Sequence, residues 1–368
     1  SVGEERELGE KLLYSVRSSF QLLDDPDITQ YINNLGESVL EVAGIQYFDY
    51  HFFVIDSKDF NAFAAPSGLI FFHSGLIASM NSENELISVM AHEIGHIVKR
   101  HLASRVEKGA YSSAASLGLA LAALAFGGAA TPALLTGALA AGQSVNLHFS
   151  RQNEEEADLL AYSWMKKLKR NPEGQVVMLE SMRRIARYRS DILPQYLLTH
   201  PNPEARMNYI ESLIDLDSGE IISESVAVDD FGFIRFKYRI LSQVKNSQAF
   251  KISMANIIAD ERATEFKKVM AQYGISQIAL HENNFDRSLE SLEKVIQHFP
   301  DKNILLTDRG VINFAAGRYQ EAENDLRSAL KIERYDMYAM RKLGQLLYQK
   351  GELEEAISYF NTITRELP

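Results

Sequence analysis

Apolar residues recur with a helical period in the N-terminal part of the chain and then change to short unbroken runs. Residues 4–43 read as two helices separated by the acidic, proline-containing turn 24–27, and the second helix has its apolar side chains on one face. The runs 52–55 and 69–72 instead predict β-strands, with the turn residues 65–68 between them. This pattern predicts a small sheet inserted between helices.

Two further helices are predicted from their polar first turns. Ser82 and Glu85 have the spacing of a capping box, and the helix that they open is expected to run toward residue 106. The other helix covers residues 153–169 and begins with acidic residues. Both carry the apolar positions of a helix with one buried face.

A long segment between these two helices has no charged residue. From Lys108 to Arg151 the intervening sequence lacks Asp, Glu, Lys and Arg and is rich in Ala, Gly and Leu. It exceeds the roughly 20 apolar residues that cross a bilayer, but Gly127-Gly128 and Thr131-Pro132 divide it into two short halves. The halves favour a packed or surface-dipping hairpin over residues 110–145, with a true membrane span as the alternative.

The middle of the chain has a weaker pattern. Residues 215–243 predict an irregular, β-containing stretch whose best strand is 231–236. Residues 256–273 predict a polar helix. We count this linker, 215–270, with the first domain, which then covers residues 1–270.

The last third contains a repeat. Small residues, larger apolar residues and glycines each recur at intervals of 34 residues: Ser288, Ala322 and Ala356; Leu292, Leu326 and Phe360; Gly310 and Gly344. A 34-residue period with small side chains at the helix contact resembles the tetratricopeptide repeat, whose units stack into one continuous core. Residues 271–368 are therefore predicted to form an all-α domain of about three repeats.

Composition and charge narrow the classes of function. The 368 residues are 46% hydrophobic and 24% charged, as in ordinary globular proteins. The net charge of −11 is spread along the chain and argues against nucleic-acid binding, which needs a basic surface. Because there is no cysteine, disulfides and thiolate metal sites are excluded. The chain opens without a basic, apolar leader, so any signal peptide is expected to have been removed or never to have existed.

The strongest chemical signal is the sequence His92-Glu93-Ile94-Gly95-His96. His92 and His96 are four residues apart on a predicted helix, so their rings project from one face and can bind one Zn²⁺ ion. Glu93 would then lie beside the open coordination position, where it can act as a general base toward water. A five-residue pattern also occurs by chance, with ordinary helix histidines as the alternative, so the interpretation needs further residues.

Those residues come from two later segments. Glu154 and Asp158 are four residues apart on one helix, so one carboxylate can bind the metal while the other holds a ligand histidine. Compensation of the helix dipole is the alternative for such an acidic first turn. Lys99 and Leu102 stand where the extended metzincin pattern needs glycine and a third histidine, which leaves Glu154 as the best third ligand. The proline-braced loop 199–206 adds one histidine and one arginine.

Together these motifs resemble the HtpX-like and CAAX-prenyl-protease-like zinc peptidases. The resemblance covers roughly residues 1–215 and is carried by the 92–96 motif, Glu154-x-x-Ala157-Asp158, His200-Pro201 with Arg206, the segment 61–68 and Ser74-Gly75-Leu76. With the C-terminal repeats, the likeness is closest to BepA-like periplasmic peptidases. It implies an α+β, mostly helical fold: a zincin-type metallopeptidase domain with a small sheet, followed by the all-α repeat domain.

The resemblance implies roles for five residues of the site. His92, His96 and Glu154 would bind the zinc cofactor. Glu93 would act as general base and then as general acid, and Asp158 would orient a ligand. The implied activity is that of a zinc metalloendopeptidase of the gluzincin type.

The loop residues His200 and Arg206 are less fixed by the motifs. In a BepA-like site the loop histidine can occupy the fourth zinc position, so we expect His200 to bind zinc in a resting state and to move away on activation. The resemblance places Arg206 near the zinc or the oxyanion, with a surface salt bridge as the alternative.

These features predict an endopeptidase that cleaves unfolded or misassembled polypeptides. The strand 69–72 is expected to expose a sheet edge to which an extended substrate adds, and the repeats offer a concave surface for polypeptide partners. The charge-free segment predicts a peripheral membrane contact through 110–145. The resemblance favours the periplasm and quality control of outer-membrane proteins or their assembly machinery. The alternatives are a chaperone-like binding protein whose metal site is blocked or structural, and an integral membrane peptidase.

Overall fold

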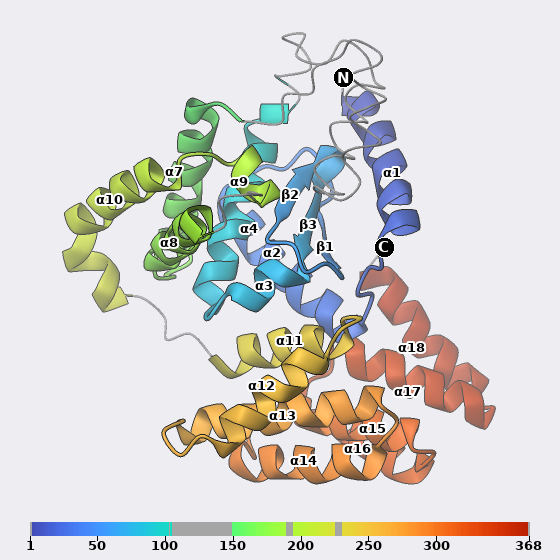
Figure 1. Cartoon of the computed structure of the whole chain (residues 1–368). Helices are drawn as coiled ribbons and strands as arrows, with labels where there is room; N and C mark the ends of the chain where they lie inside the picture. Colours follow the sequence, from blue (N-terminus) through green and yellow to red (C-terminus); the bar gives the residue numbers. More distant parts are fainter. Residues whose placement is uncertain (1, 103, 105–148, 189–193, 225–229, 367–368) are drawn as a thin grey trace. The chain divides into compact units, whose positions relative to one another are not determined.

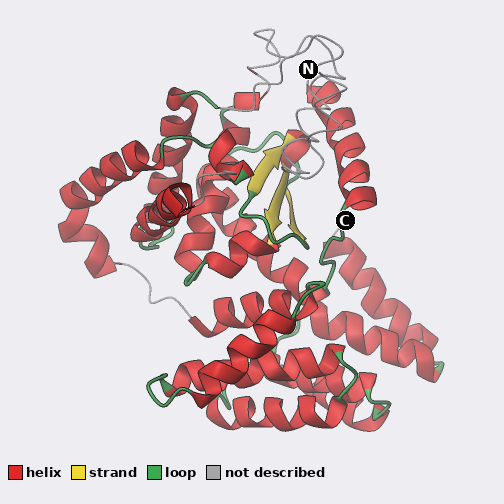
Figure 2. Cartoon of the chain, in the orientation of Figure 1, coloured by secondary structure: helices red, strands yellow, loops and turns green. Residues whose placement is uncertain are grey.

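The computed structural model describes residues 2–102, 104, 149–188, 194–224 and 230–366, and the chain divides into two compact units. The first unit is formed by residues 1–24 and 31–233, and the second by 25–30 and 234–368. Within the described residues both units are mainly helical, and the strands belong to a small sheet in the first unit (Figure 2). This division comes earlier in the chain than the sequence-based domain boundary at residue 270, which stays a prediction.

The first unit begins with the two helices that the hydrophobic period predicts. They are α1, Val2–Ser19, and α2, Pro26–Ala43. Leu12 and Val16 of α1 pack against a core that includes Ile55, Phe63 and Phe71 of the sheet.

The sheet has three strands in the order β1–β3–β2. β1, His51–Ile55, runs parallel to β3, Leu69–His73, while β2, Ala62–Ala65, is antiparallel to β3 and joins it through a 3-10 turn at Pro66–Gly68. All five residues of β3 are buried. The prediction that residues 69–72 form the exposed edge is therefore wrong. The edge strands are β1 and β2, and the small residues of β2 give little strand signal in the sequence.

Six described helices follow the sheet in the first unit: α3, Ser74–Ser79; α4, Glu83–Val98; α7, Arg151–Lys167; α8, Glu173–Tyr188; α9, Gln195–Thr199; and α10, Pro203–Glu224. α4 ends earlier than predicted because Lys99 caps it and Arg100 has a left-handed backbone with φ of 52°. Helical conformation resumes at His101. The predicted hairpin 110–145 lies outside the described residues. None of the described helices has the length and apolar character of a membrane span.

The second unit contains most of α11, Asp230–Gln243, whose first turn belongs to the first unit, and the helices that follow it: α12, Gln248–Ala259; α13, Glu265–His281; α14, Phe285–His298; α15, Ile304–Ala315; α16, Tyr319–Ile332; α17, Met337–Lys350; and α18, Leu353–Glu366. The strand predicted at 231–236 is wrong, because these residues lie in α11, where Phe233, Phe236 and Ile240 form a buried helical stripe. The single helix predicted at 256–273 is also wrong, because it is interrupted before Thr264, whose side chain caps α13.

The 34-residue repeat corresponds to three helix pairs, α13–α14, α15–α16 and α17–α18, drawn from orange to red in Figure 1. The repeated small residues Ser288, Ala322 and Ala356 are buried at the contacts within these pairs. A Cβ on Gly310 would lie 2.9 Å from Leu326. Small side chains thus let the two helices of a pair approach, as the sequence period predicts.

The second unit also contains a buried group of charged residues, which we name the arginine–aspartate cluster. Arg235 donates hydrogen bonds of 2.9 Å to both carboxylate oxygens of Asp308, and one of 3.0 Å to Asp27. Arg239 donates to both oxygens of Asp25, at 3.0 and 2.9 Å, and to Asp308 at 3.1 Å. Each guanidinium is therefore neutralised by carboxylates within the same unit.

Candidate metal centre

The centre is built on α4, whose buried face carries both motif histidines. The Nε2 atoms of His92 and His96 lie 3.0 Å apart, and both side chains are almost completely buried. Gly95 lies where α4 meets α7, and a Cβ there would be 3.2 Å from the Cα of Ala157. Glycine at this position lets α7 lie close enough to bring its own side chains to the histidines.

α7 brings Glu154 to the same point. A capping box between Ser150 and Asn153 fixes the start of the helix. Glu154 follows in the first turn and is buried, with its Oε1 atom 3.4 Å from His96 Nε2 and its Oε2 atom 3.6 Å from His92 Nε2. The first turn of α7 therefore faces the metal motif of α4.

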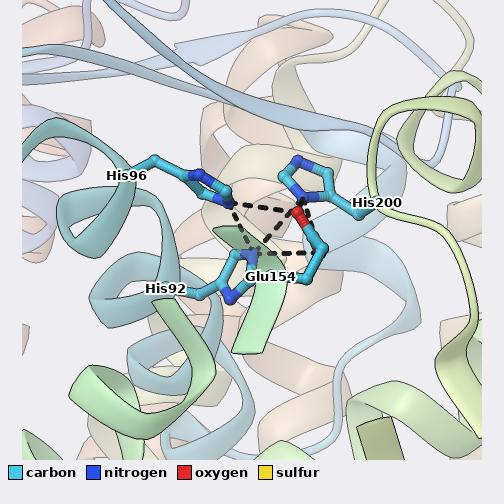
Figure 3. Close-up of side chains that lie close together, drawn as sticks. All are labelled: His92, His96, Glu154 and His200. Atoms are coloured by element: carbon cyan, nitrogen blue, oxygen red, sulfur yellow. Dashed lines mark hydrogen bonds and ion pairs between the residues drawn. The ribbon is translucent and has the colours of Figure 1, made fainter. Parts of the chain in front are cut away.

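His200 follows α9 and completes the group. Its Nδ1 atom lies 3.0 Å from Glu154 Oε1 and 3.3 Å from His92 Nε2. Its ring packs on Tyr196, with the ring centroids 4.3 Å apart. The side chains of His200, Glu154 and the two helix histidines point toward one another (Figure 3).

We name His92, His96, Glu154 and His200 the four-donor cluster, and their spacing fits a tetrahedral metal ion. One donor atom from each residue lies within 4.8 Å of the others. Ligands at about 2.0–2.1 Å from a tetrahedral Zn²⁺ would be about 3.3 Å from one another, and the five separations given above run from 3.0 to 3.6 Å. Imidazole nitrogen and carboxylate oxygen are also donors that Zn²⁺ accepts.

Asp158 and Arg206 contact two residues of the four-donor cluster, His92 and Glu154. Asp158 Oδ1 lies 2.8 Å from His92 Nδ1. Arg206 donates two hydrogen bonds of 2.7 Å to Asp158, and its Nη1 atom lies 2.7 Å from Glu154 Oε2. Because Arg206 is buried, it does not form the surface salt bridge that the sequence left open. It holds two carboxylates that face the ligand histidines.

Glu93 lies between the sheet and His200. Its Oε2 atom accepts a hydrogen bond of 2.9 Å from the backbone N–H of Ala64 in β2. Its Oε1 atom lies 3.5 Å from Nε2 of His200. The two nitrogens of the His200 ring thus face different groups, Nδ1 toward the metal position and Nε2 toward Glu93.

Burial and charge set the protonation of three of the four donors in a direction that suits metal binding. His200 differs, because burial alone would lower its pKa but Glu154 and Glu93 outweigh burial and raise it. Burial lowers the pKa of His96 to about 4 and also lowers the pKa of His92, so both rings are neutral near pH 7 and can act as ligands. Burial alone would raise the pKa of Glu154, but His200 and Arg206 outweigh it and the pKa is well below its usual value. The carboxylate is therefore ionised.

The charged side chains around the cluster are unbalanced. Glu93, Glu154 and Asp158 contribute three carboxylates, and Arg206 pairs with two of them, Glu154 and Asp158. A buried excess of negative charge is costly unless a cation compensates it. A proton on His200, whose pKa is raised, would offset part of the excess, and a metal cation that displaced this proton would offset it as well.

Sequence reasoning missed residues that contact the ligands of this centre. His101 lies 2.9 Å from His96, Nδ1 to Nδ1, and Phe149 stacks on His96 with the ring centroids 4.1 Å apart. Tyr196 packs on His200 from α9. The positive φ of Arg100, which turns the chain back toward His96, has no recognisable signal in the sequence.

Comparison with known proteins gives matches over both parts of the chain. The family model described as peptidase family M48 matches residues 26–214, and two tetratricopeptide repeat models match residues 273–336 and 313–368. The chain is 30% identical to the beta-barrel assembly-enhancing protease of Escherichia coli (strain K12) over 370 residues, 99% of this chain and 74% of that protein.

Two further relatives are similar over shorter stretches. The putative beta-barrel assembly-enhancing protease of Vibrio cholerae is 30% identical over 319 residues, 83% of this chain and 63% of that protein. The mitochondrial metalloendopeptidase OMA1 of Schizosaccharomyces pombe is 30% identical over 185 residues, 50% of this chain and 52% of that protein.

Proposed function

The chain belongs to peptidase family M48 and is a metalloendopeptidase, and we propose that its metal is zinc and that its substrates are unfolded or misassembled envelope proteins. The observation that carries the proposal is the four-donor cluster, whose donor separations of 3.0–3.6 Å suit a tetrahedral ion of this size. The carboxylates around the cluster favour a bound cation.

We assign the chemistry to residues already in contact with the cluster. When bound, a zinc ion would polarise the scissile carbonyl and activate a water molecule. Glu93 would take the proton from that water and return it to the leaving amine, and the Ala64 N–H holds its carboxylate in place. Asp158 and Arg206 would orient His92 and Glu154 through the short contacts described above.

We propose that His200 holds the enzyme in a resting state. Its Nδ1 atom stands at the fourth donor position, and its Nε2 atom lies 3.5 Å from Glu93. In this position one ring occupies both the site that a substrate carbonyl would need and the space beside the base. Activation would then require His200 to leave, which also breaks its packing on Tyr196.

The proposed substrate path follows β2. Ala64 directs its N–H away from β3 and toward Glu93, so this edge of the sheet adjoins the catalytic carboxylate. An extended peptide that added to β2 would lie along the cluster. This favours unfolded segments, because a folded domain offers no free strand.

Partners and location are proposed from the relatives and the repeats. The relatives from Escherichia coli and Vibrio cholerae described above are named for beta-barrel assembly. We propose that this chain acts in the periplasm on outer-membrane proteins or their assembly machinery, which the repeats would recruit. A peripheral membrane contact through 110–145 is part of the same proposal, although that segment lies outside the described residues.

The experiment combines metal analysis with cleavage of casein. We expect one zinc ion per chain and zinc-dependent cleavage, which Glu93→Gln lowers by roughly 10²–10⁴-fold without loss of zinc. Glu155→Gln is the matched control, because Glu155 is an exposed neighbour on α7. Zinc-independent cleavage, or full activity in Glu93→Gln, would refute the assignment.

The same assay tests His200. His200→Ala should raise the cleavage rate, because the fourth position and the space beside Glu93 become free. A folded His200→Ala protein with unchanged or lower activity would rule out the resting state. If neither the wild type nor this variant cleaves any unfolded substrate, the chaperone-like alternative with a blocked metal site is favoured.

A further inference from the structure

A second histidine, His101, lies behind the ligand His96. Its Nδ1 atom is 2.9 Å from His96 Nδ1, and its Nε2 atom is 3.2 Å from Oε2 of Glu156. His101 is buried, whereas the Glu156 side chain is about one-third exposed and also accepts a hydrogen bond of 3.2 Å from Gln152. The three side chains form a continuous chain from the metal position to the surface of α7.

Metal binding through His96 Nε2 would fix the direction of every hydrogen bond in this chain. A neutral imidazole that binds through Nε2 carries its proton on Nδ1. That proton can only be donated to Nδ1 of His101, which must then carry its own proton on Nε2 and donate it to Glu156. Each ring therefore has one tautomer that satisfies both of its contacts.

The other ligand histidine has a direct version of the same arrangement. His92 Nδ1 lies 2.8 Å from Asp158, without an intervening ring. Both histidines thus reach a carboxylate on α7, one directly and one through His101. α4 ends in the common way, with the left-handed residue Arg100 after its C-cap, and this turn brings His101 back to His96.

We propose that His101 is a positioning residue for the metal centre. It links the Glu156 carboxylate to His96 through two hydrogen bonds and so holds the His96 ring in the tautomer that binds the metal. This inference rests on the proposed zinc site. His101 would then orient the ring of His96 through its Nδ1 atom, as Asp158 orients the ring of His92.

Three substitutions of His101 separate this role from simple packing. In Asn the side-chain amide lies where His101 has Nδ1, so His101→Asn keeps an acceptor for His96 and loses the contact with Glu156. In Gln the amide lies nearer the position of Nε2, so His101→Gln keeps the contact with Glu156 and loses the contact with His96. His101→Leu fills the space and keeps neither contact.

The readout is the dissociation constant for Zn²⁺, measured by competition with a chromophoric chelator, together with the unfolding midpoint of the metal-free protein. We expect His101→Leu and His101→Gln to weaken zinc binding by roughly 10- to 100-fold, and His101→Asn and Glu156→Gln to weaken it less. The absorption bands of the Co²⁺-loaded protein should change in the same order. Glu155→Gln is the matched control and should match the wild type.

The outcomes separate the two proposals. If the wild type binds zinc and His101→Leu binds it within twofold, the positioning role is refuted while the proposed function stands. If His101→Gln binds more tightly than His101→Asn, packing volume rather than the contact with His96 decides, and the role is also refuted. If the wild type binds no zinc, the proposed function fails first.

Discussion

Two buried polar clusters of this chain contain similar residues in opposite arrangements. In the arginine–aspartate cluster of the second unit, the guanidinium groups lie between the carboxylates, at 2.9–3.1 Å. In the four-donor cluster of the first unit, the donor atoms face one another, and no arginine lies among them. Arg206 contacts only the Oε2 atom of Glu154 in this cluster by an ion pair. The first arrangement carries its own cations, whereas the second is completed by a cation from outside.

The difference teaches how each cluster contributes to the protein. A cluster that carries its own cations needs no ion from solution, but the loss of one partner leaves buried charges poorly compensated. A cluster of converging donors contributes stability only when its ion is present, and the contribution depends on ion concentration. The two clusters should therefore respond to different treatments, and the following predictions test this.

The largest effect is expected in the arginine–aspartate cluster. Arg239→Met removes hydrogen bonds to Asp25, Gln277, Asp308 and Tyr338. Asp25 then lacks a guanidinium partner and keeps only its hydrogen bonds from Gln243 and the backbone, while Arg235 alone is left to pair with Asp27 and Asp308. The free energy of unfolding should fall by about 3–5 kcal/mol, measured by denaturant titration of the helical circular dichroism. Zinc affinity of the folded variant should not change.

The control for this substitution is Arg262→Met, because Arg262 is almost fully exposed and makes only a loose ion pair with Asp260. It should leave the unfolding curve unchanged. If Arg239→Met has as small an effect as the control, the cluster is not structural and the comparison fails.

The second effect is expected from removal of the metal. At free zinc 100-fold above its dissociation constant, binding stabilises the folded state by roughly 3 kcal/mol, and a chelator should abolish this gain. Trp164 is the only tryptophan and is buried in α7, so its fluorescence reports the first unit. A chelator that has the same effect on His96→Ala, which lacks a ligand, would show that the stabilisation does not come from the four-donor cluster.

The smallest effect concerns a buried histidine that belongs to neither cluster. His73 in β3 is fully buried, and neither ring nitrogen has a hydrogen-bond partner among the described residues. Burial lowers the pKa of His73 to about 4, whereas the unfolded chain binds that proton near pH 6.5. The unfolded state therefore binds more protons between these values, and stability falls as the pH drops through this window.

From pH 7 to pH 5 this loss amounts to roughly 2 kcal/mol for one histidine. His73→Leu should remove it, so that its unfolding free energy changes less with pH than that of the wild type. His51→Gln, which alters an exposed histidine on the neighbouring strand, is the control. Parallel pH curves for wild type and His73→Leu would contradict the burial argument.

The parts predictable from sequence are those fixed by local geometry. His92 and His96 meet because four residues make about one helical turn, and the 34-residue period predicts the helix pairs because small residues recur at their contacts. The order of strands in a sheet depends on residues far apart in the sequence. The hydrophobic pattern along the chain therefore did not predict that β3 lies between β1 and β2. At α11 the alternation of Phe231 and Phe233 predicts a strand, but Phe233, Phe236 and Ile240 are all buried, and their spacing is that of one face of a helix.

The close contact at Gly95 has a consequence for the geometry of the metal site. A methyl group there would lie 3.2 Å from the backbone of Ala157, so the lack of a side chain lets α4 and α7 lie close together. Any widening at this contact would move Glu154 away from the histidines and beyond the ligand distances of a small tetrahedral ion. The fit of the site to its ion thus depends partly on a residue that contributes no ligand atom.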